Sequence, residues 1–107
     1  MIVTPGKAVA GYRIKKTLGL VRGNTIRARH IGRDITAVFK NIVGGEIEEY
    51  TKMMAESREQ AIDRMVSDAA GKGADAVVAL RFASSEISAG AAEVLVYGTA
   101  VKLGGEG

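Results

Sequence analysis

The first quarter of the chain has the pattern of a β-strand. Between residues 9 and 30, apolar side chains recur at close to every second position among lysines, arginines and threonines, which is the period of a strand. The alternation is imperfect, and it indicates either a bulge near Gly19 or a turn at Gly23-Asn24. We therefore predict one long bent strand or a β-hairpin in this segment.

A short helix is predicted next, over residues 34–43. Asp34 suits the N-cap position, because its carboxylate can accept a hydrogen bond from a backbone N–H of the first helical turn. Apolar residues then follow at helical spacing. Gly44-Gly45 would end this helix, because glycine readily takes the left-handed backbone angles found after a helix C-terminus.

The clearest predicted element is a long helix over residues 46–72. Its apolar residues follow a spacing of three and four, interrupted by one charged residue, Arg58, and the opposite face is polar and mostly acidic. Glutamates in the first turn and Lys72 in the last turn suit the helix dipole. Gly73 is expected to follow the C-terminus of the helix.

Two strands are predicted to complete the domain, over residues 75–87 and 93–103, joined by a hairpin turn at Ser88-Ala89-Gly90. Residues 1–8, which include the one proline of the chain, are expected to form an extended lead-in, and residues 104–107 a frayed tail. The chain is thus predicted to be a single α+β domain over residues 1–107.

The two C-terminal strands argue for an oligomer. Their centres, residues 76–80 and 94–97, are continuous apolar runs, which are typical of strands buried on both faces. The predicted helices can cover one face of the sheet, and a large apolar face is rarely left exposed on a monomer. We therefore expect subunits to share a core. The alternative is that β propensity alone selects these residues and that the second face stays partly exposed.

Composition narrows the class of protein. The chain has 107 residues, 5% aromatic residues and no cysteine. Without cysteine there are no disulfides and no thiolate metal ligands, and a secreted domain of this size usually carries disulfides, so we expect a cytoplasmic protein. We find neither a signal-peptide pattern nor a run of about 18 apolar residues, and we expect no membrane partner.

The net charge of +3 is unevenly distributed. Residues 1–45 hold nine Lys/Arg against one acid, a balance of +8, and residues 46–107 hold six Lys/Arg against eleven acids, a balance of −5. A basic half can indicate a nucleic-acid surface. The interpretation that we favour is that a basic surface packs near the acidic helix, within a subunit or across an interface.

Several short motifs, taken together, resemble the YbjQ-like family of small uncharacterised proteins. They are Arg33-Asp34, Ile-Val-Gly-Gly at 42–45, Tyr50, Gly-Ala-Asp-Ala-Val-Val at 73–78 and Gly-Thr-Ala-Val-Lys at 98–102. Each motif is weak alone, but the set is specific because it extends over nearly the whole chain in the family's order and spacing.

The resemblance implies a β-α-β-β fold similar to the dodecin subunit, with a long helix packed on an antiparallel sheet. It also implies a ring-like homo-oligomer, most often a pentamer, with sheets joined between subunits. The family carries the label "Putative heavy-metal-binding", and many members have a cysteine in the first strand. This chain has Leu18-Gly19 at that place, a departure that counts against the metal label here.

The best candidate ligand site is the cluster of Arg29, His30, Arg33 and Asp34, where the first strand gives way to the short helix. A helix N-terminus attracts anions, and the two arginines could each make bidentate contacts with a phosphate or a carboxylate. The alternative, which we favour for Arg33, is a structural ion pair with Asp34 or with a neighbouring subunit.

Other chemistry has less support. His30 is the one imidazole of the chain, so a metal site would need one His30 from each subunit of a ring. A single histidine also specifies no catalytic triad, and nearly all carboxylates lie on the polar face of the long helix.

Nucleic-acid binding has little support as well. Tyr12 alone could stack on a base, and no nucleic-acid motif accompanies the basic residues of the first strand. These basic residues are Arg13, Lys15, Lys16, Arg22, Arg27 and Arg29.

The sequence therefore predicts a non-enzymatic homo-oligomeric scaffold or small-ligand-binding protein, with no cofactor. Its expected partners are copies of itself and a small anionic ligand. Two alternatives stay open, a metal-binding protein and a nucleic-acid-associated protein that uses the basic first half of the chain.

Overall fold

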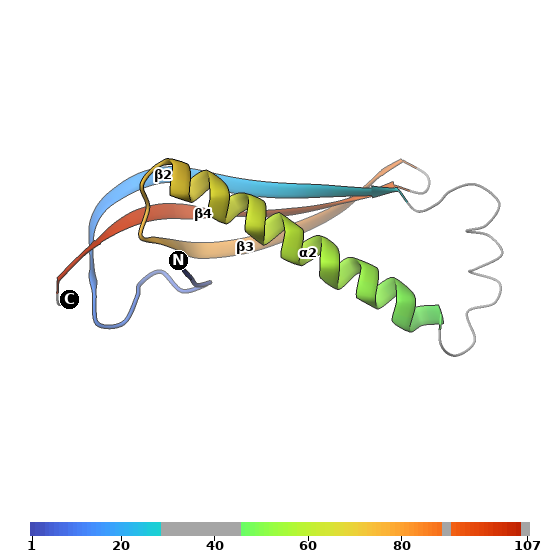
Figure 1. Cartoon of the computed structure of the whole chain (residues 1–107), viewed down its shortest axis with the longest axis horizontal. Helices are drawn as coiled ribbons and strands as arrows, with labels where there is room; N and C mark the ends of the chain where they lie inside the picture. The colour runs from blue at the N-terminus through green and yellow to red at the C-terminus, as the bar shows by residue number, and fades with distance from the viewer. Residues whose placement is uncertain (29–45, 89–90, 106–107) are drawn as a thin grey trace.

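The structure, a computed structural model, describes residues 1–28, 46–88 and 91–105. Its elements follow in the order β1 (Ile2–Val3), β2 (Arg13–Ala28), α2 (Glu46–Gly71), β3 (Ala76–Ser88) and β4 (Ala91–Gly104). The strands form one sheet, and α2 crosses one face of it diagonally (Figure 1). The α+β class and the long helix on a sheet are thus confirmed. The short helix predicted over 34–43 lies outside the described residues.

β2 is one long strand rather than a hairpin. It pairs with β4 along its whole length, and its register shifts between Ile14 and Lys16 and between Thr17 and Gly19. Gly19 has a φ of +115°, which glycine adopts at little steric cost. The bulge predicted near Gly19 is therefore confirmed. The alternative of a turn at Gly23-Asn24 is wrong, because both residues pair with β4 in regular register.

α2 buries one narrow stripe against the sheet. Ser57, Ala61, Met65 and Ala69 are fully buried, and their spacing of four places them on one side of the helix. Arg58, which the apolar pattern places in the stripe, is exposed instead. The small neighbour Ser57 takes the buried position, where the helix and the sheet are in direct contact.

The C-terminus of α2 is closed by backbone hydrogen bonds. The helix ends at Gly71, so Lys72 follows it rather than lying in the last turn. Gly73, with a φ of +76°, donates its N–H to the Ala70 carbonyl at 3.0 Å, and Ala74 donates to the Ala69 carbonyl at 3.1 Å. This pair of bonds is a Schellman motif, and it confirms the predicted role of Gly73.

β3 and β4 form the predicted antiparallel hairpin, whose turn residues 89–90 lie outside the described residues. Their register shifts between Val78 and Arg81, where Ala79 has a φ of 55°. Gly98 of β4 lies beside this irregularity. A Cβ on Gly98 would come 2.6 Å from Val77 Cγ1 and 3.0 Å from the Val78 carbonyl oxygen. A larger residue would therefore clash with β3 at this position, and glycine does not.

The sheet is mixed, not purely antiparallel. Its strand order is β1-β3-β4-β2, and β1 runs parallel to β3. The lead-in continues along the same edge, because Leu80 donates its N–H to the Thr4 carbonyl at 3.2 Å and Ala79 donates to the Gly6 carbonyl at 2.8 Å. The sequence predicts an extended lead-in but not its place in the sheet. β1 has only two residues, which are too few to show the alternation of apolar and polar residues typical of a strand.

Two clusters form the core, one on each face of the sheet. Under α2, buried residues of β2, β3 and β4 pack with the helix: Val21, Val77, Val94, Val96 and Ala100 with Ala61, Met65 and Ala69. On the opposite face Ala76, Val78 and Val101 are buried, with Val9 and Leu103 packed against them. Part of the second face is therefore covered within one subunit, by Val9 from the segment between the lead-in and β2.

β4 extends to Gly104, one residue into the segment where the sequence predicts a frayed tail. The pairing continues one residue further, because Arg13 donates its N–H to the Gly105 carbonyl at 3.2 Å. Residues 106–107 lie outside the described residues.

Candidate functional site

The residues of the predicted ligand site, Arg29, His30, Arg33 and Asp34, lie outside the described residues. The chain enters their segment from the end of β2 at Ala28 and leaves it at the start of α2 at Glu46. The predicted site thus stays a prediction.

The sheet face opposite α2 divides into a covered half and an open half. Register places alternate residues of β2 and β4 on this face, with Leu20 paired to Thr99, Arg22 to Tyr97 and Ile26 to Glu93. In the open half, Leu20 is 63% exposed, Ile26 60% and Tyr97 37%. Large apolar side chains gathered on one face of a sheet are typical of a contact surface. We call Leu20, Ile26 and Tyr97 the open apolar face.

Polar groups at the rim of this face are held in place by hydrogen bonds. Asn24 donates from Nδ2 to Oε2 of Glu93 at 3.0 Å, which links β2 to β4 on the exposed side. Arg81 donates from Nη1 to the Pro5 carbonyl at 3.0 Å and to the Leu80 carbonyl at 2.7 Å. Arg81 therefore ties the lead-in to β3 and marks the boundary between the covered half and the open half.

The outer edge of β2 is closed by side chains from α2. Asp68 accepts a hydrogen bond at Oδ2 from the backbone N–H of Arg22 at 3.3 Å. Arg64 donates from Nη1 to the Asn24 carbonyl at 2.6 Å. Because an uncovered strand edge can pair with another chain, these two contacts protect the middle of β2 from edge pairing.

The other outer edge, along β3, is covered over part of its length. The lead-in and β1 pair with residues 76–80 of β3. From Arg81 onward, β3 has β4 as its partner on one side, and no strand of the described chain pairs on the other. This stretch of backbone is one place in the described structure where a further strand could join the sheet.

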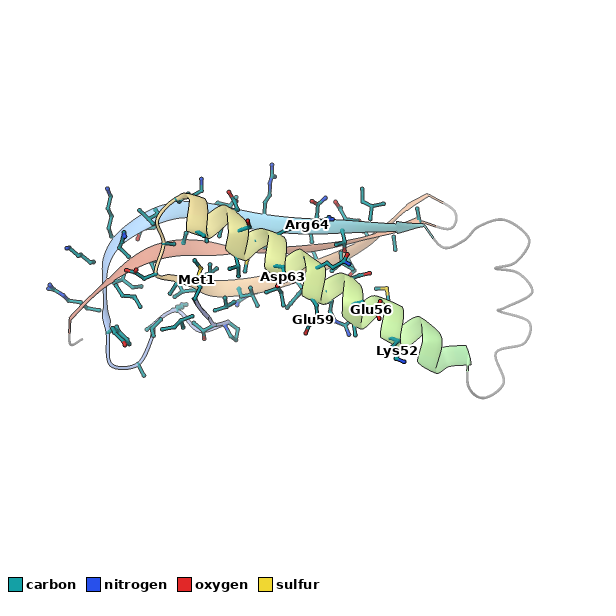
Figure 2. All side chains as sticks on the ribbon, in the orientation of Figure 1. Met1, Lys52, Glu56, Glu59, Asp63 and Arg64 are labelled. Atoms are coloured by element: carbon teal, nitrogen blue, oxygen red, sulfur yellow. The ribbon has the colours of Figure 1, made fainter. Side chains whose placement is uncertain are left out.

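The outer face of α2 is polar. Lys52, Glu56, Glu59 and Asp63 project from it (Figure 2), and all four are exposed. Among the described residues, no three His, Cys, Asp or Glu side chains lie close enough together to hold a metal ion. The acids of α2 are therefore spread along the helix as a charged surface rather than gathered into a site.

Basic residues from distant parts of the chain meet at one end of the sheet. Three of them, Arg13, Lys15 and Lys16, lie at the start of β2 and belong to the basic residues that the sequence places in the first strand. The register places Lys102 directly opposite Lys16, and the end of α2, followed by Lys72, lies at the same end of the sheet (Figure 1). Sequence reasoning missed Lys72 and Lys102, because both lie in the half of the chain that is acidic overall.

Residues 1–104 match the sequence model of the YbjQ family, which is described as "Putative heavy-metal-binding". The chain belongs to the YbjQ family. The resemblance found in the sequence motifs is therefore confirmed over almost the whole chain.

Relatives within the YbjQ family are close in sequence. A "UPF0145 protein" from Dehalococcoides mccartyi is 57% identical over 101 residues, covering 94% of this chain and 97% of its own. A second from Methanosarcina acetivorans is 55% identical over 103 residues, covering 96% and 97%. A third from Thermosipho melanesiensis is 53% identical over 103 residues, covering 96% and 95%. These three names state no activity, so they identify no reaction for this YbjQ protein.

The fold also has a solved counterpart. A crystal structure of a protein of unknown function from Pediococcus pentosaceus, assigned to the DUF74 family, superimposes with a TM-score of 0.67. The match covers 97% of this chain and 98% of that chain, at 18% sequence identity. At this identity the comparison supports the fold alone.

In the described part of the YbjQ chain, no helical segment combines the length and hydrophobicity that a membrane crossing needs.

Proposed function

We propose that this YbjQ protein is a non-catalytic, cytoplasmic homo-oligomer that serves as a scaffold or binds a small anionic ligand between its subunits. The observation that carries the proposal is the open apolar face, where Leu20 and Ile26 are 63% and 60% exposed. The ring form, and a pentamer in particular, is what the family resemblance implies.

Contact with a second copy of the chain would stabilise this face relative to its exposure to solvent. Burying a side chain such as Leu20 or Ile26 stabilises a contact by about 1.5–3 kcal/mol. Arg22 and Asn24 lie between them on the same face of β2, and this mixture of apolar and polar groups is typical of a protein interface. A neighbouring subunit packed on this face would supply the cover that α2 supplies on the other face of the sheet.

The two sheet edges differ in how far they are open to a neighbouring subunit. The β2 edge is closed in its middle by Asp68 and Arg64, whereas the β3 edge has no strand beside it from Arg81 onward within the described residues. A contact between two different surfaces of neighbouring copies closes into a ring when the rotation per subunit allows it. Edge pairing along β3 is therefore the proposed way in which sheets join between subunits.

The proposed ligand site comprises Arg29, His30, Arg33 and Asp34, which join β2 to the segment before α2. Two arginines near the N-terminus of the short helix that the sequence predicts over 34–43 would recognise phosphate or carboxylate groups. The test is Arg33→Ala, with bound mass and subunit number read together by native mass spectrometry. We expect the variant to lose a co-purifying ligand and keep its assembly. If the assembly dissociates instead, the cluster is structural and the ligand site is wrong.

Metal binding is a second candidate, because the family description names it. With no cysteine and one histidine in the chain, such a site would need His30 from several subunits of a ring. Metal content per subunit, measured by elemental mass spectrometry, tests this. A His30→Ala variant with unchanged metal content would exclude the candidate.

A further inference from the structure

Four cations from three separate segments meet at one end of the sheet. Arg13 and Lys16 lie at the start of β2, Lys72 directly follows α2, and Lys102 lies near the end of β4. Figure 1 shows that the start of β2, the end of β4 and the end of α2 lie at the same end of the molecule. All four side chains are exposed. We call these four residues the basic end.

The fold holds these charges close together. Lys16 and Lys102 are direct partners in the antiparallel register of β2 and β4, and such partners have Cβ atoms about 4.5–5.5 Å apart. A Cβ on Gly73 would come 3.8 Å from Lys102 Nζ, so the ammonium group lies against the loop that carries Lys72. Arg13 lies over Gly104, where a Cβ would come 2.8 Å from Arg13 Nε.

No described acid forms an ion pair with any of these cations. Asp75, which directly precedes β3, accepts at Oδ2 from the backbone N–H of Leu103 at 2.9 Å. Like charges directly opposite each other in a sheet destabilise it, so the Lys16–Lys102 pair does not serve the fold.

The end of α2 does not account for the cluster either. The helix dipole favours a cation near a C-terminus, and Lys72 or Lys102 alone would satisfy that preference. The carbonyls of Ala69 and Ala70 already accept backbone N–H groups. A local arrangement that costs stability without a structural return is expected at functional sites.

We propose that the basic end binds a compact oligophosphate, a ligand with two or three linked phosphate groups. Three ammonium groups and a guanidinium at one end of the sheet match a ligand with several negative charges. A long polyanion fits less well, because the outer face of α2 on the same side of the sheet carries Glu56, Glu59 and Asp63 (Figure 2), which would repel its backbone. The oligophosphate is either free or the phosphate tail of a nucleotide.

This inference is independent of the ligand site proposed at Arg29, His30, Arg33 and Asp34. It also does not require the oligomer, because the basic end lies within one subunit. The two proposals can therefore fail separately. An Arg29→Ala/Arg33→Ala variant distinguishes them, because it removes the arginines of the other proposed site and leaves the basic end intact.

The experiment is isothermal titration calorimetry of the full chain with inorganic triphosphate at low ionic strength. We expect the wild type to bind, and the Lys16→Gln/Lys102→Gln variant to bind at least about tenfold more weakly, since two charge-assisted contacts are lost. The matched control is Lys52→Gln/Arg58→Gln, which removes two exposed charges from α2 and should change the affinity less than about twofold. Arg29→Ala/Arg33→Ala should leave the affinity unchanged.

Two further readouts separate function from structure. The Lys16→Gln/Lys102→Gln variant should keep or raise its thermal midpoint, because a like-charge pair is removed; a lower midpoint together with weaker binding would indicate a structural role. ATP titrated in parallel identifies the source: equal affinity indicates a free oligophosphate, and tighter binding indicates a nucleotide.

Three further results would overturn the proposal. The first is no binding of triphosphate by the wild type. The second is an equal loss of affinity in Lys16→Gln/Lys102→Gln and in the control Lys52→Gln/Arg58→Gln, which would indicate a response to net charge alone. The third is tighter binding of a single-stranded oligonucleotide than of triphosphate, which would make the basic end part of a nucleic-acid surface instead.

Discussion

Gly23 of β2 lies directly beneath Ala61 of α2. A Cβ on Gly23 would come 2.1 Å from the Ala61 carbonyl oxygen and 2.5 Å from the Met65 backbone nitrogen. The two backbones are therefore in van der Waals contact at this point, with no room for a side chain. This contact sets the distance between the helix and the sheet, and the fully buried stripe of α2 is centred on it.

Gly23→Ala should therefore be strongly destabilising. The new methyl group has to push α2 away from β2, and overpacking of this kind costs about 1–3 kcal/mol. Denaturant unfolding measures the change. The control is Gly71→Ala, where a Cβ would meet nothing within 4 Å and helix propensity predicts a gain of up to about 1 kcal/mol. Equal stabilities for the two variants would contradict this account of the helix–sheet contact.

Thr25→Val tests the polar contact beside it. Thr25 is 3% exposed, and its hydroxyl donates to the Ser57 carbonyl of α2 at 3.1 Å. Valine keeps the shape but loses the donor, so we expect a loss of about 0.5–1.5 kcal/mol in the free energy of unfolding. Thr17→Val, at an exposed threonine of the same strand, should change it by less than about 0.5 kcal/mol. A larger effect at Thr17 would contradict the assignment.

These contacts show how far the sequence predicts this fold. The long helix, the bulge at Gly19 and the final hairpin follow from local periodicity and glycine chemistry, and each is found where the pattern places it. The role of Gly23 is not predictable in this way. A glycine within a strand pattern indicates a turn, a bulge or a close approach, and which of these holds depends on where α2 lies.

The second face of the sheet shows the same limit. The apolar runs in β3 and β4 indicate burial on both faces, but not what provides the cover. The structure shows that Val9, which precedes β2, packs against the cluster of Ala76 and Val78, while Leu20 and Ile26 stay exposed. Lys102 likewise joins Lys16 through register alone, since the two residues are far apart in the sequence.

The closed edge of β2 gives a prediction about aggregation. Asp68→Ala combined with Arg64→Ala removes both side chains that bond to the Arg22 and Asn24 backbone. The uncovered strand edge should then pair with other copies in an uncontrolled way, and higher-order aggregates should increase in light scattering. Asp63→Ala, on the exposed face of the same helix, is the control and should leave the scattering unchanged. If the double variant scatters no more than Asp63→Ala, the two contacts do not protect the edge.

The open apolar face gives a prediction about assembly. Leu20→Glu places a charge at a residue that is 63% exposed in one subunit, so it should change the stability of a subunit by less than about 0.5 kcal/mol. In an interface the same charge would be buried without a partner, and we expect the assembly to dissociate. Multi-angle light scattering after gel filtration measures the mass. Lys52→Glu, on the outer face of α2, should keep the wild-type mass; dissociation of both variants would mean that Leu20 has no specific part in assembly.

The most direct test of the central claim is native mass spectrometry of the gently purified wild-type protein. We predict a single closed multimer, with five subunits as the number that the family resemblance implies, and with Leu20 and Ile26 protected in the contacts between copies. A clean monomer at micromolar concentration would contradict the account, because the open apolar face would then be exposed to solvent in the working protein.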